Sequence, residues 1–217
     1  MPLSYDLHIH SCLSPCGDAD MTPNNIVHMA LLAGFDMIAL TDHNTCGNCP
    51  ALLTVAREAG LTAVPGMELC TAEEAHVVCL FPELEAAMAF DAAVAPTLPP
   101  VRNRPDIFGE QLMMDAGDEI VGRRDILLTT ASSISVEEVL PLARSAGPPF
   151  PPTSTGNPTA SFLRWEISLR WGSGRWRSPP GGTCPLCWPG IPKLGGNRCC
   201  STPTLIICTS LGIPPPG

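Results

Sequence analysis

The residues up to about position 146 repeat one pattern, in which a short apolar segment typical of a strand is followed by a segment with helical periodicity. Strands are predicted at residues 4–10, 37–40, 61–64 and 75–81, and helices at residues 22–32, 48–59, 82–94 and 135–146. Residues 95–130 contain several prolines and predict an irregular excursion with a short hairpin. Strands that alternate with helices favour parallel strand–helix–strand units, so the sequence predicts an α/β sheet or barrel.

The composition changes sharply near residue 150. Residues 1–150 carry 20 acidic and 6 basic side chains and all five histidines, whereas residues 151–217 carry one acid, six bases and all four tryptophans. Twelve of the 25 prolines lie in the last 67 residues, where little periodicity is visible. Such a segment does not predict regular structure. We therefore expect a folded domain at residues 1–147 and an irregular tail at residues 148–217.

Charge and hydropathy limit the expected partners and compartment. The net charge is −9, and an acidic surface repels nucleic-acid phosphates, so no strong nucleic-acid binding is expected. No basic start followed by an apolar run predicts a signal peptide, and no apolar run is long enough to predict a membrane span. We expect a cytoplasmic protein without a membrane partner, whose 11 cysteines are thiols or metal ligands rather than disulfides.

Histidine and carboxylate side chains recur at the ends of the predicted strands. His8 and His10 are two residues apart, so in a strand they point to the same face. The other candidates lie in the following loop and at successive strand ends: Asp18, His43, Glu68 and His76. One histidine at a strand end is more often a hydrogen-bonded surface residue, so their joint placement carries the prediction. Imidazole and carboxylate suit zinc, manganese or iron, and the sequence predicts a metal site.

These residues resemble the successive motifs of the PHP (polymerase and histidinol phosphatase) family of metal-dependent phosphoesterases. The motifs are Asp6–Ser11, Asp18, Met21–Pro23, Thr41–His43, Pro65–Glu68 and His76. The resemblance is specific through residue 81 and weaker up to about residue 147. It implies an incomplete form of the family's distorted seven-stranded β/α barrel, with up to three divalent ions (Zn, Mn or Fe) at its carboxyl end. His8, His10, Asp18, His43, Glu68 and His76 map onto family ligand positions, and Glu68 onto a bridging one.

The activity implied by the resemblance is hydrolysis of a phosphate mono- or diester. A metal-bound hydroxide is expected as the nucleophile, so no side chain is assigned that role. The ions would also stabilise the charge that develops on the phosphate oxygens. Arg102 and Arg104 are candidate phosphate contacts because a guanidinium fork fits phosphate, although loop arginines are more often simply solvated. The expected substrate is a small phosphate ester or a nucleotide.

The chain departs from the family after residue 147. The family takes further ligands from its later strands, including an Asp-x-His pair, but this chain has no histidine after His76. We interpret the change in composition as a shifted reading frame near residues 147–152. Codons for residues 152–163 can be chosen so that reading one base earlier gives HIDRKPHSLLS, which resembles a segment common in the family after the helix that corresponds to residues 135–146.

Two alternatives follow from the same residues. The chain is either an active phosphoesterase or a truncated, catalytically inactive PHP-like protein that binds metal. A third reading uses the cysteines, which would make a redox pair or a separate zinc site: Cys46 and Cys49 form a C-x-x-C pair beside His43, and Cys12 and Cys16 flank the first candidate ligands. Cys184, Cys187, Cys199 and Cys200 suggest a zinc ribbon only weakly, because Pro and Gly dominate their surroundings.

Overall fold

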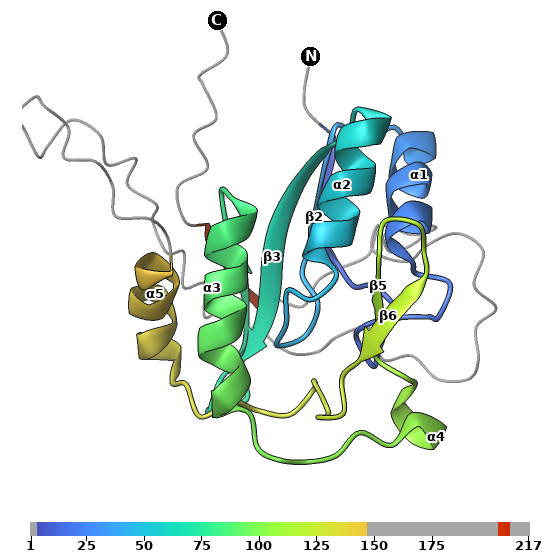
Figure 1. The fold of residues 1–217 in the computed structure, drawn as a ribbon. Coiled ribbons are helices and arrows are strands. Elements are labelled where there is room, and N and C mark those ends of the chain that lie inside the picture. The colour runs from blue at the N-terminus through green and yellow to red at the C-terminus, as the bar shows by residue number, and fades with distance from the viewer. Residues whose placement is uncertain (1–3, 147–203, 209–217) are drawn as a thin grey trace, which may run out of the picture. The chain divides into compact units, whose positions relative to one another are not determined.

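A computed structural model describes residues 4–146 and 204–208 of the chain (Figure 1). The elements follow one another as β1 (Tyr5–Ile9), α1 (Pro23–Ala33), β2 (Met37–Leu40), α2 (Cys49–Ala59), β3 (Thr62–Cys70), β4 (His76–Leu80), α3 (Leu84–Val94), the 3₁₀ turn η1 (Ala95–Thr97), α4 (Pro105–Phe108), β5 (Leu112–Met114), β6 (Ile120–Arg123), α5 (Val136–Ser145) and β7 (Thr204–Cys208). The predicted alternation of strands and helices is therefore present up to α3.

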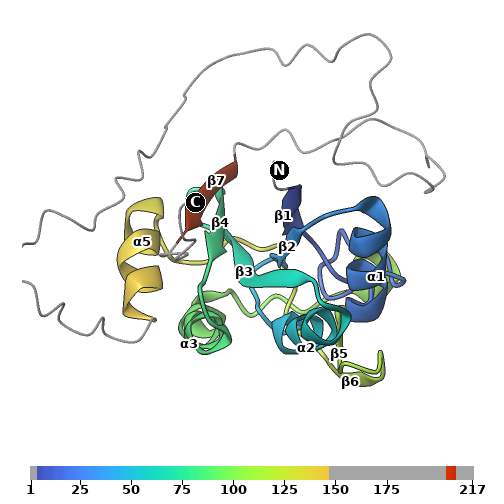
Figure 2. The ribbon, with the colours of Figure 1, turned by 90° about the horizontal axis from the view of Figure 1, so that it is seen from above.

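Five strands form one curled sheet in the order β1-β2-β3-β4-β7, and α1, α2 and α3 lie along one of its faces (Figure 2). The β1–β2 and β2–β3 pairs are parallel, as predicted. The β3–β4 pair is antiparallel, which corrects the prediction of parallel units throughout. Only residues 71–75 join these two strands, and a loop of that length is too short for a helical crossover. The result is a mixed α/β half-barrel.

Strand β3 is longer than the sequence predicted, because it continues through Pro65 and Gly66 to Cys70. Pro65 has no N–H to donate, but its carbonyl accepts the Phe81 N–H at 2.9 Å, so it stays within the ladder. A side chain at Gly66 would place its Cβ 2.8 Å from the Cys79 carbonyl oxygen. The missing side chain therefore lets β4 approach β3 closely, just before Glu68.

The helices begin and end at residues with recognisable capping roles. Thr22 precedes α1, and its side chain accepts the Asn25 N–H at 3.3 Å. Helices α1 and α2 end at glycines with left-handed backbone, Gly34 (φ 77°) and Gly60 (φ 74°). At α5, the Glu138 carboxylate accepts the Ser135 N–H at 2.9 Å, which completes the predicted capping box. These local signals explain why the helix boundaries agree with the sequence.

The main hydrophobic core lies between the sheet and the helices. It includes the buried Ile38 and Met67 of the strands and Leu52 of α2. The Phe81 and Phe90 rings are 5.1 Å apart in this core, within the range of favourable aromatic pairs. A second cluster on the other sheet face joins Ala39, Val64, Val78 and Leu80. The sheet is thus apolar on both faces at its centre, which is typical of a barrel wall.

Residues 147–203 and 209–217, which make up most of the predicted tail, lie outside the described residues. Residues 204–208 belong to the segment for which no regular structure was predicted, yet they form β7, which pairs in parallel with β4. Their sequence, Thr-Leu-Ile-Ile-Cys, has the β-branched apolar character of a strand. The division into residues 1–147 and 148–217 otherwise stays a prediction. Among the described helices, none is long and apolar enough to cross a membrane.

Candidate metal centre

The strands bring together five of the six predicted ligands, with four histidines around the carboxylate of the fifth. His8 lies in β1 and His10 directly follows it, His43 follows β2, Glu68 lies within β3, and His76 begins β4. The pairing of β3 with β4 sets Glu68 opposite Val78 and Cys70 opposite His76, so Glu68 and His76 are diagonal neighbours on one face. An isolated parallel bridge joins His43 to Glu68. The backbone ladder alone therefore brings these residues together.

The Glu68 carboxylate is the centre of the cluster. Its Oε2 lies 3.2 Å from His8 Nε2, 3.1 Å from His10 Nε2 and 3.2 Å from His43 Nδ1, and its Oε1 lies 2.9 Å from His76 Nδ1. Burial raises the pKa of the Glu68 carboxyl, but hydrogen bonds from His10 and His8 outweigh it and hold the pKa well below its usual range. Glu68 is therefore a carboxylate at neutral pH.

The spacing of these atoms matches that of ligands around one cation. Two nitrogens bound to a tetrahedral zinc ion at ~2.0–2.1 Å lie about 3.3 Å apart. The His8 and His10 Nε2 atoms are 3.1 Å apart, close to that value. Three groups of candidate ligands have atoms that all lie within 4.8 Å of one another: His8–His10–Glu68, His43–Glu68–His76 and His10–Cys16–His43. They share members, so they form one continuous cluster suited to divalent metal.

His43 has a ring nitrogen without a hydrogen bond. Its side chain is almost fully buried, and Nδ1 faces Glu68 at 3.2 Å without hydrogen-bond geometry. Burial, together with the neighbouring His10, lowers the pKa of His43 to about 3. A buried polar atom without a partner is costly, and a neutral imidazole is the form that binds metal. The residues present therefore fit a divalent ion.

A hydrogen-bond network behind the cluster orients His10. The buried Asp42 carboxylate accepts the Ser11 N–H at 2.7 Å, the Ser11 hydroxyl at 2.6 Å and the Ser14 hydroxyl at 2.7 Å. Ser14 Oγ also accepts the His43 N–H at 3.0 Å and lies 3.2 Å from His10 Nδ1. Because Ser14 uses its only proton on Asp42, His10 Nδ1 must be the donor, which makes Nε2, the nitrogen that faces Glu68, the candidate ligand atom.

The loop after His43 is held by Asn44, whose backbone is left-handed (φ 50°). Its side-chain amide donates to the carbonyls of Leu128 and Thr130, and its side-chain oxygen accepts the Cys70 N–H at 2.8 Å. Asn tolerates this backbone conformation better than most residues. The loop is therefore fixed to the end of β3, which keeps His43 beside Glu68.

The remaining predicted site residues lie elsewhere. Asp18 is exposed, and its Oδ1 accepts the Asp20 N–H at 3.0 Å. The Arg104 guanidinium pairs with Asp106 at 2.8 Å, and both side chains are largely exposed. Arg102 is exposed and pairs through its backbone with Ile126. The roles of Asp18 as a ligand and of both arginines as phosphate contacts stay predictions.

Sequence reasoning missed three supporting residues, Ser11, Ser14 and Asp42, and it considered Cys16 only together with Cys12, for a redox pair or a separate zinc site. Asp42 belongs to the Thr41–His43 motif, so a polar side chain in a buried strand end was a visible signal. The serines and Cys16 gave no periodic signal, because the path of the loop decides what they contact. The C-x-x-C reading is disfavoured, since Cys46 and Cys49 are buried and both donate to the Gly66 carbonyl.

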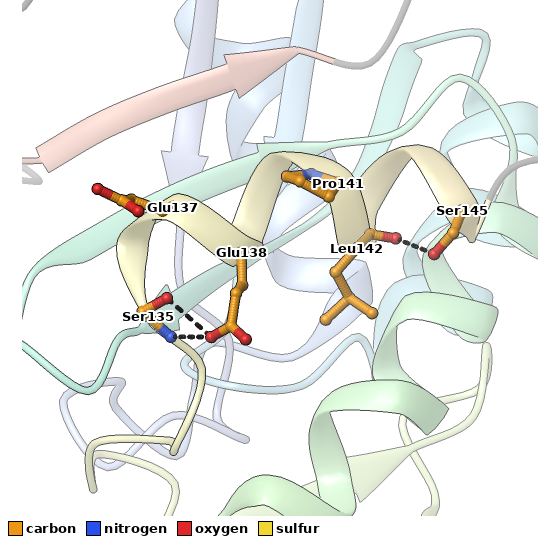
Figure 3. Close-up of a pocket in the computed structure, with 6 residues that line it drawn as sticks. All are labelled: Ser135, Glu137, Glu138, Pro141, Leu142 and Ser145. Atoms are coloured by element: carbon orange, nitrogen blue, oxygen red, sulfur yellow. Dashed lines mark hydrogen bonds between the residues drawn. The ribbon is translucent and has the colours of Figure 1, made fainter.

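A separate hollow of about 740 Å³ lies along α5 (Figure 3). Its lining residues are Ser135, Glu137, Glu138, Pro141, Leu142 and Ser145. Glu138 is engaged with Ser135, and the Ser145 hydroxyl donates to the Leu142 carbonyl at 2.7 Å. None of the clustered histidines lines it, so the hollow is not part of the candidate metal centre.

The fold and the cluster define an α/β half-barrel with a histidine–glutamate site of the divalent-metal type. Residues 6–105 match the family model of the PHP domain, which confirms the resemblance over this part of the chain. The chain is 35% identical over 83 residues to a 5'-3' exoribonuclease of Haemophilus influenzae, a match covering 37% of this chain and 29% of the relative. It is 36% identical over 76 residues to the 5'-3' exoribonuclease Rnm of Salmonella typhimurium, covering 34% of this chain and 25% of the relative.

A solved structure is also similar in part. It is a Bifidobacterium adolescentis protein assigned as a metal-dependent phosphoesterase, with 22% identity, a TM-score of 0.35, and coverage of 45% of this chain and 35% of that chain. The chain thus spans between a quarter and a third of the length of the exoribonuclease relatives it matches. Because those relatives are named for action on RNA, the expectation of no strong nucleic-acid binding is not supported.

Proposed function

We propose that the chain is a metal-dependent phosphoesterase that hydrolyses a phosphodiester of a nucleotide or a nucleic-acid end. The observation that carries this proposal is the convergence of four imidazoles on the Glu68 carboxylate. Divalent ions, when bound, supply the Lewis acidity and the activated water that phosphate-ester hydrolysis requires. The exoribonuclease names of two relatives favour a phosphodiester over a monoester.

The chain's own residues would hold and orient the ions. Glu68 presents both carboxylate oxygens, which suits a ligand that bridges two ions, with His8 and His10 on one side and His76 on the other. Ser14 fixes the His10 tautomer, and Asn44 fixes the loop that carries His43. The acidic chain would bind a phosphate only where cations outweigh its own charge. Zinc, manganese and iron all suit this ligand set, and a cytoplasmic location stays a prediction.

The alternative is a PHP-like protein that binds metal without turnover. It is favoured by one observation, that no histidine follows His76 in the sequence. A late Asp-x-His pair, expected from the family resemblance, is therefore missing. Metal would then bind at the cluster with lower occupancy, and no phosphate ester would be cleaved.

The experiment is metal content and turnover measured on the same purified chain. An aryl phosphate, an aryl phosphodiester and a short oligoribonucleotide are each offered with added manganese or zinc. The proposal expects bound metal and diester turnover that are both lost in Glu68→Ala and His8→Ala. Bound metal with no turnover on any of the three substrates would establish the inactive alternative instead.

A further inference from the structure

We propose that Cys16 is a metal ligand, joining His10 and His43 to form a sulfur-containing subsite of the cluster. The inference rests on the proposed metal-dependent function and names a ligand beyond the histidines and Glu68. The Cys16 Sγ atom and one ring nitrogen of each histidine lie within 4.8 Å of one another. Sulfur and nitrogen ligands of a tetrahedral zinc ion lie about 3.6 Å apart, so a small side-chain rotation would close the site.

The loop that carries Cys16 is turned back on itself by its own backbone hydrogen bonds. The Ser14 N–H donates to the Ser11 carbonyl at 3.1 Å, and the Gly17 N–H donates to the Ser14 carbonyl at 2.8 Å. A side chain at Gly17 would place its Cβ 2.1 Å from the Ser11 carbonyl oxygen, so only glycine allows this close approach. The glycine next to Cys16 therefore folds the loop back toward the histidines.

A second observation on the same cluster points to a cation. His43 is 7% exposed, and its Nδ1 has no hydrogen-bond partner. His10 offers Nε2 rather than Nδ1, because Ser14 accepts the Nδ1 proton. One ring nitrogen of each of these two histidines lies within 4.8 Å of the sulfur. A cation bound at this group would give the buried His43 imidazole a partner.

Asp18 is the competing ligand from the same loop. Its carboxylate already accepts the Asp20 N–H, and its backbone carbonyl accepts the Met21 N–H at 3.0 Å. It belongs to none of the compact ligand groups found among the described residues. The geometry therefore favours Cys16 over Asp18. A thiolate selects thiophilic ions, so this subsite would prefer zinc or cobalt to manganese.

Cobalt(II) titration of the full chain tests the proposal, because the cobalt spectrum reports metal binding and sulfur ligation by separate bands. Visible ligand-field bands report that the ion is bound at all, and a near-ultraviolet thiolate-to-cobalt charge-transfer band reports sulfur. The expected result is both bands in the wild type, with loss of the charge-transfer band alone in Cys16→Ser. Cys16→Asp should keep the visible bands without the charge-transfer band and should lower the preference for zinc over manganese.

Two controls test five of the ten other thiols. Cys12→Ser changes a buried cysteine on the same loop whose Sγ donates to the Leu112 carbonyl, and it should keep the band. A variant with Cys184, Cys187, Cys199 and Cys200 all changed to Ser should keep it too. Visible bands without a charge-transfer band in the wild type, or a band that survives Cys16→Ser, would overturn the Cys16 proposal and leave the metal centre intact. No cobalt bands in any variant would overturn both.

Discussion

The Nδ1 atom of His43 lies 3.2 Å from Oε2 of Glu68, yet the two atoms share no hydrogen bond. The same carboxylate oxygen lies within 3.2 Å of His8 Nε2 and 3.1 Å of His10 Nε2. This oxygen is already approached by two other ring nitrogens, and His43 Nδ1 is a buried polar atom left without a hydrogen bond, which is costly. A cation between these atoms resolves the conflict, so removal of the carboxylate should affect metal binding most.

Glu68→Gln is therefore expected to weaken metal binding by more than the ~10–100-fold typical of changes to residues behind the ligands. The amide keeps the size of the side chain but carries no charge to offset that of the ions. Isothermal titration with zinc or manganese measures the effect. Glu58→Gln, on the exposed face of α2, is the matched control and should bind like the wild type. Equal affinities for the two variants would show that metal does not bind at Glu68.

Ser14→Ala should weaken metal affinity about 10–100-fold without removing any ligand. Ser14 Oγ links Asp42 to His10 and also accepts the His43 N–H, so its loss frees the His10 ring and leaves a buried donor unpaired. The free energy of unfolding should fall by about 1–3 kcal/mol in the metal-free chain. Ser145→Ala removes an exposed hydroxyl at the end of α5 and serves as the control. Unchanged affinity in Ser14→Ala would mean that the His10 ring is oriented by other contacts.

The fold was predictable from sequence wherever local signals decide the structure. Strand β2 was predicted at its observed bounds, and the caps Thr22, Gly34 and Gly60 mark the helix ends as expected. Strand β3 was predicted too short, because Pro65 and Gly66 resemble strand breakers. Their compatibility with the sheet depends on the register with β2 and β4, which is a tertiary property. The antiparallel direction of β4 was missed for the same reason, because a strand that ends at residue 64 hides how short the loop between β3 and β4 is.

The sequence could predict those candidate ligands that lie in strands or just after them. Residue type and spacing were enough to select Glu68 and the four histidines around it. They could not show that Cys16 comes within 4.8 Å of His10 and His43, because the path of its loop against Ser11 decides that distance. The Ser14–Asp42 contact was equally hidden, since its partners are 28 residues apart in the sequence.

The thiols of Cys46 and Cys49 should resist modification in the folded chain. Both are buried, and burial, together with Cys49, raises the pKa of Cys46 well above its usual value, so little thiolate forms. Brief labelling with a maleimide, followed by peptide mapping, should therefore modify Cys16 before either of them in the metal-free chain. Labelling of Cys46 or Cys49 as fast as Cys16 would restore the redox-pair reading.

The reading-frame interpretation predicts a specific result at the nucleotide level. Sequencing of the coding region around codon 150 should show that a shift of one base restores the HIDRKPHSLLS segment in place of residues 153–163. The restored reading should continue with further strand patterns and a late Asp-x-His pair. The chain encoded in that frame should bind more metal per molecule than this one. A nucleotide sequence without such a continuation in either other frame would refute the interpretation.

The stability of the metal-free chain should depend on His43 below neutral pH. The pKa of His43 is lowered from 6.5 to about 3, so between these values the unfolded chain takes up a proton that the folded chain does not. The free energy of unfolding should then fall as the pH falls, by up to ~1.4 kcal/mol per pH unit for this one proton. Asp42 acts in the opposite direction, because burial raises the pKa of its carboxyl, so the contribution of His43 must be isolated by comparison.

Denaturant unfolding in the presence of a chelator, between pH 4.5 and 6.5, makes that comparison with His43→Gln. The wild type should lose stability more steeply than the variant as the pH is lowered, because the variant has no imidazole to protonate on unfolding. His28→Gln, an exposed position on α1, should follow the wild type. If the free energy of unfolding of the wild type and of His43→Gln depends equally on pH, His43 is not buried as a neutral imidazole. The argument that this imidazole is available to bind a cation would then be refuted.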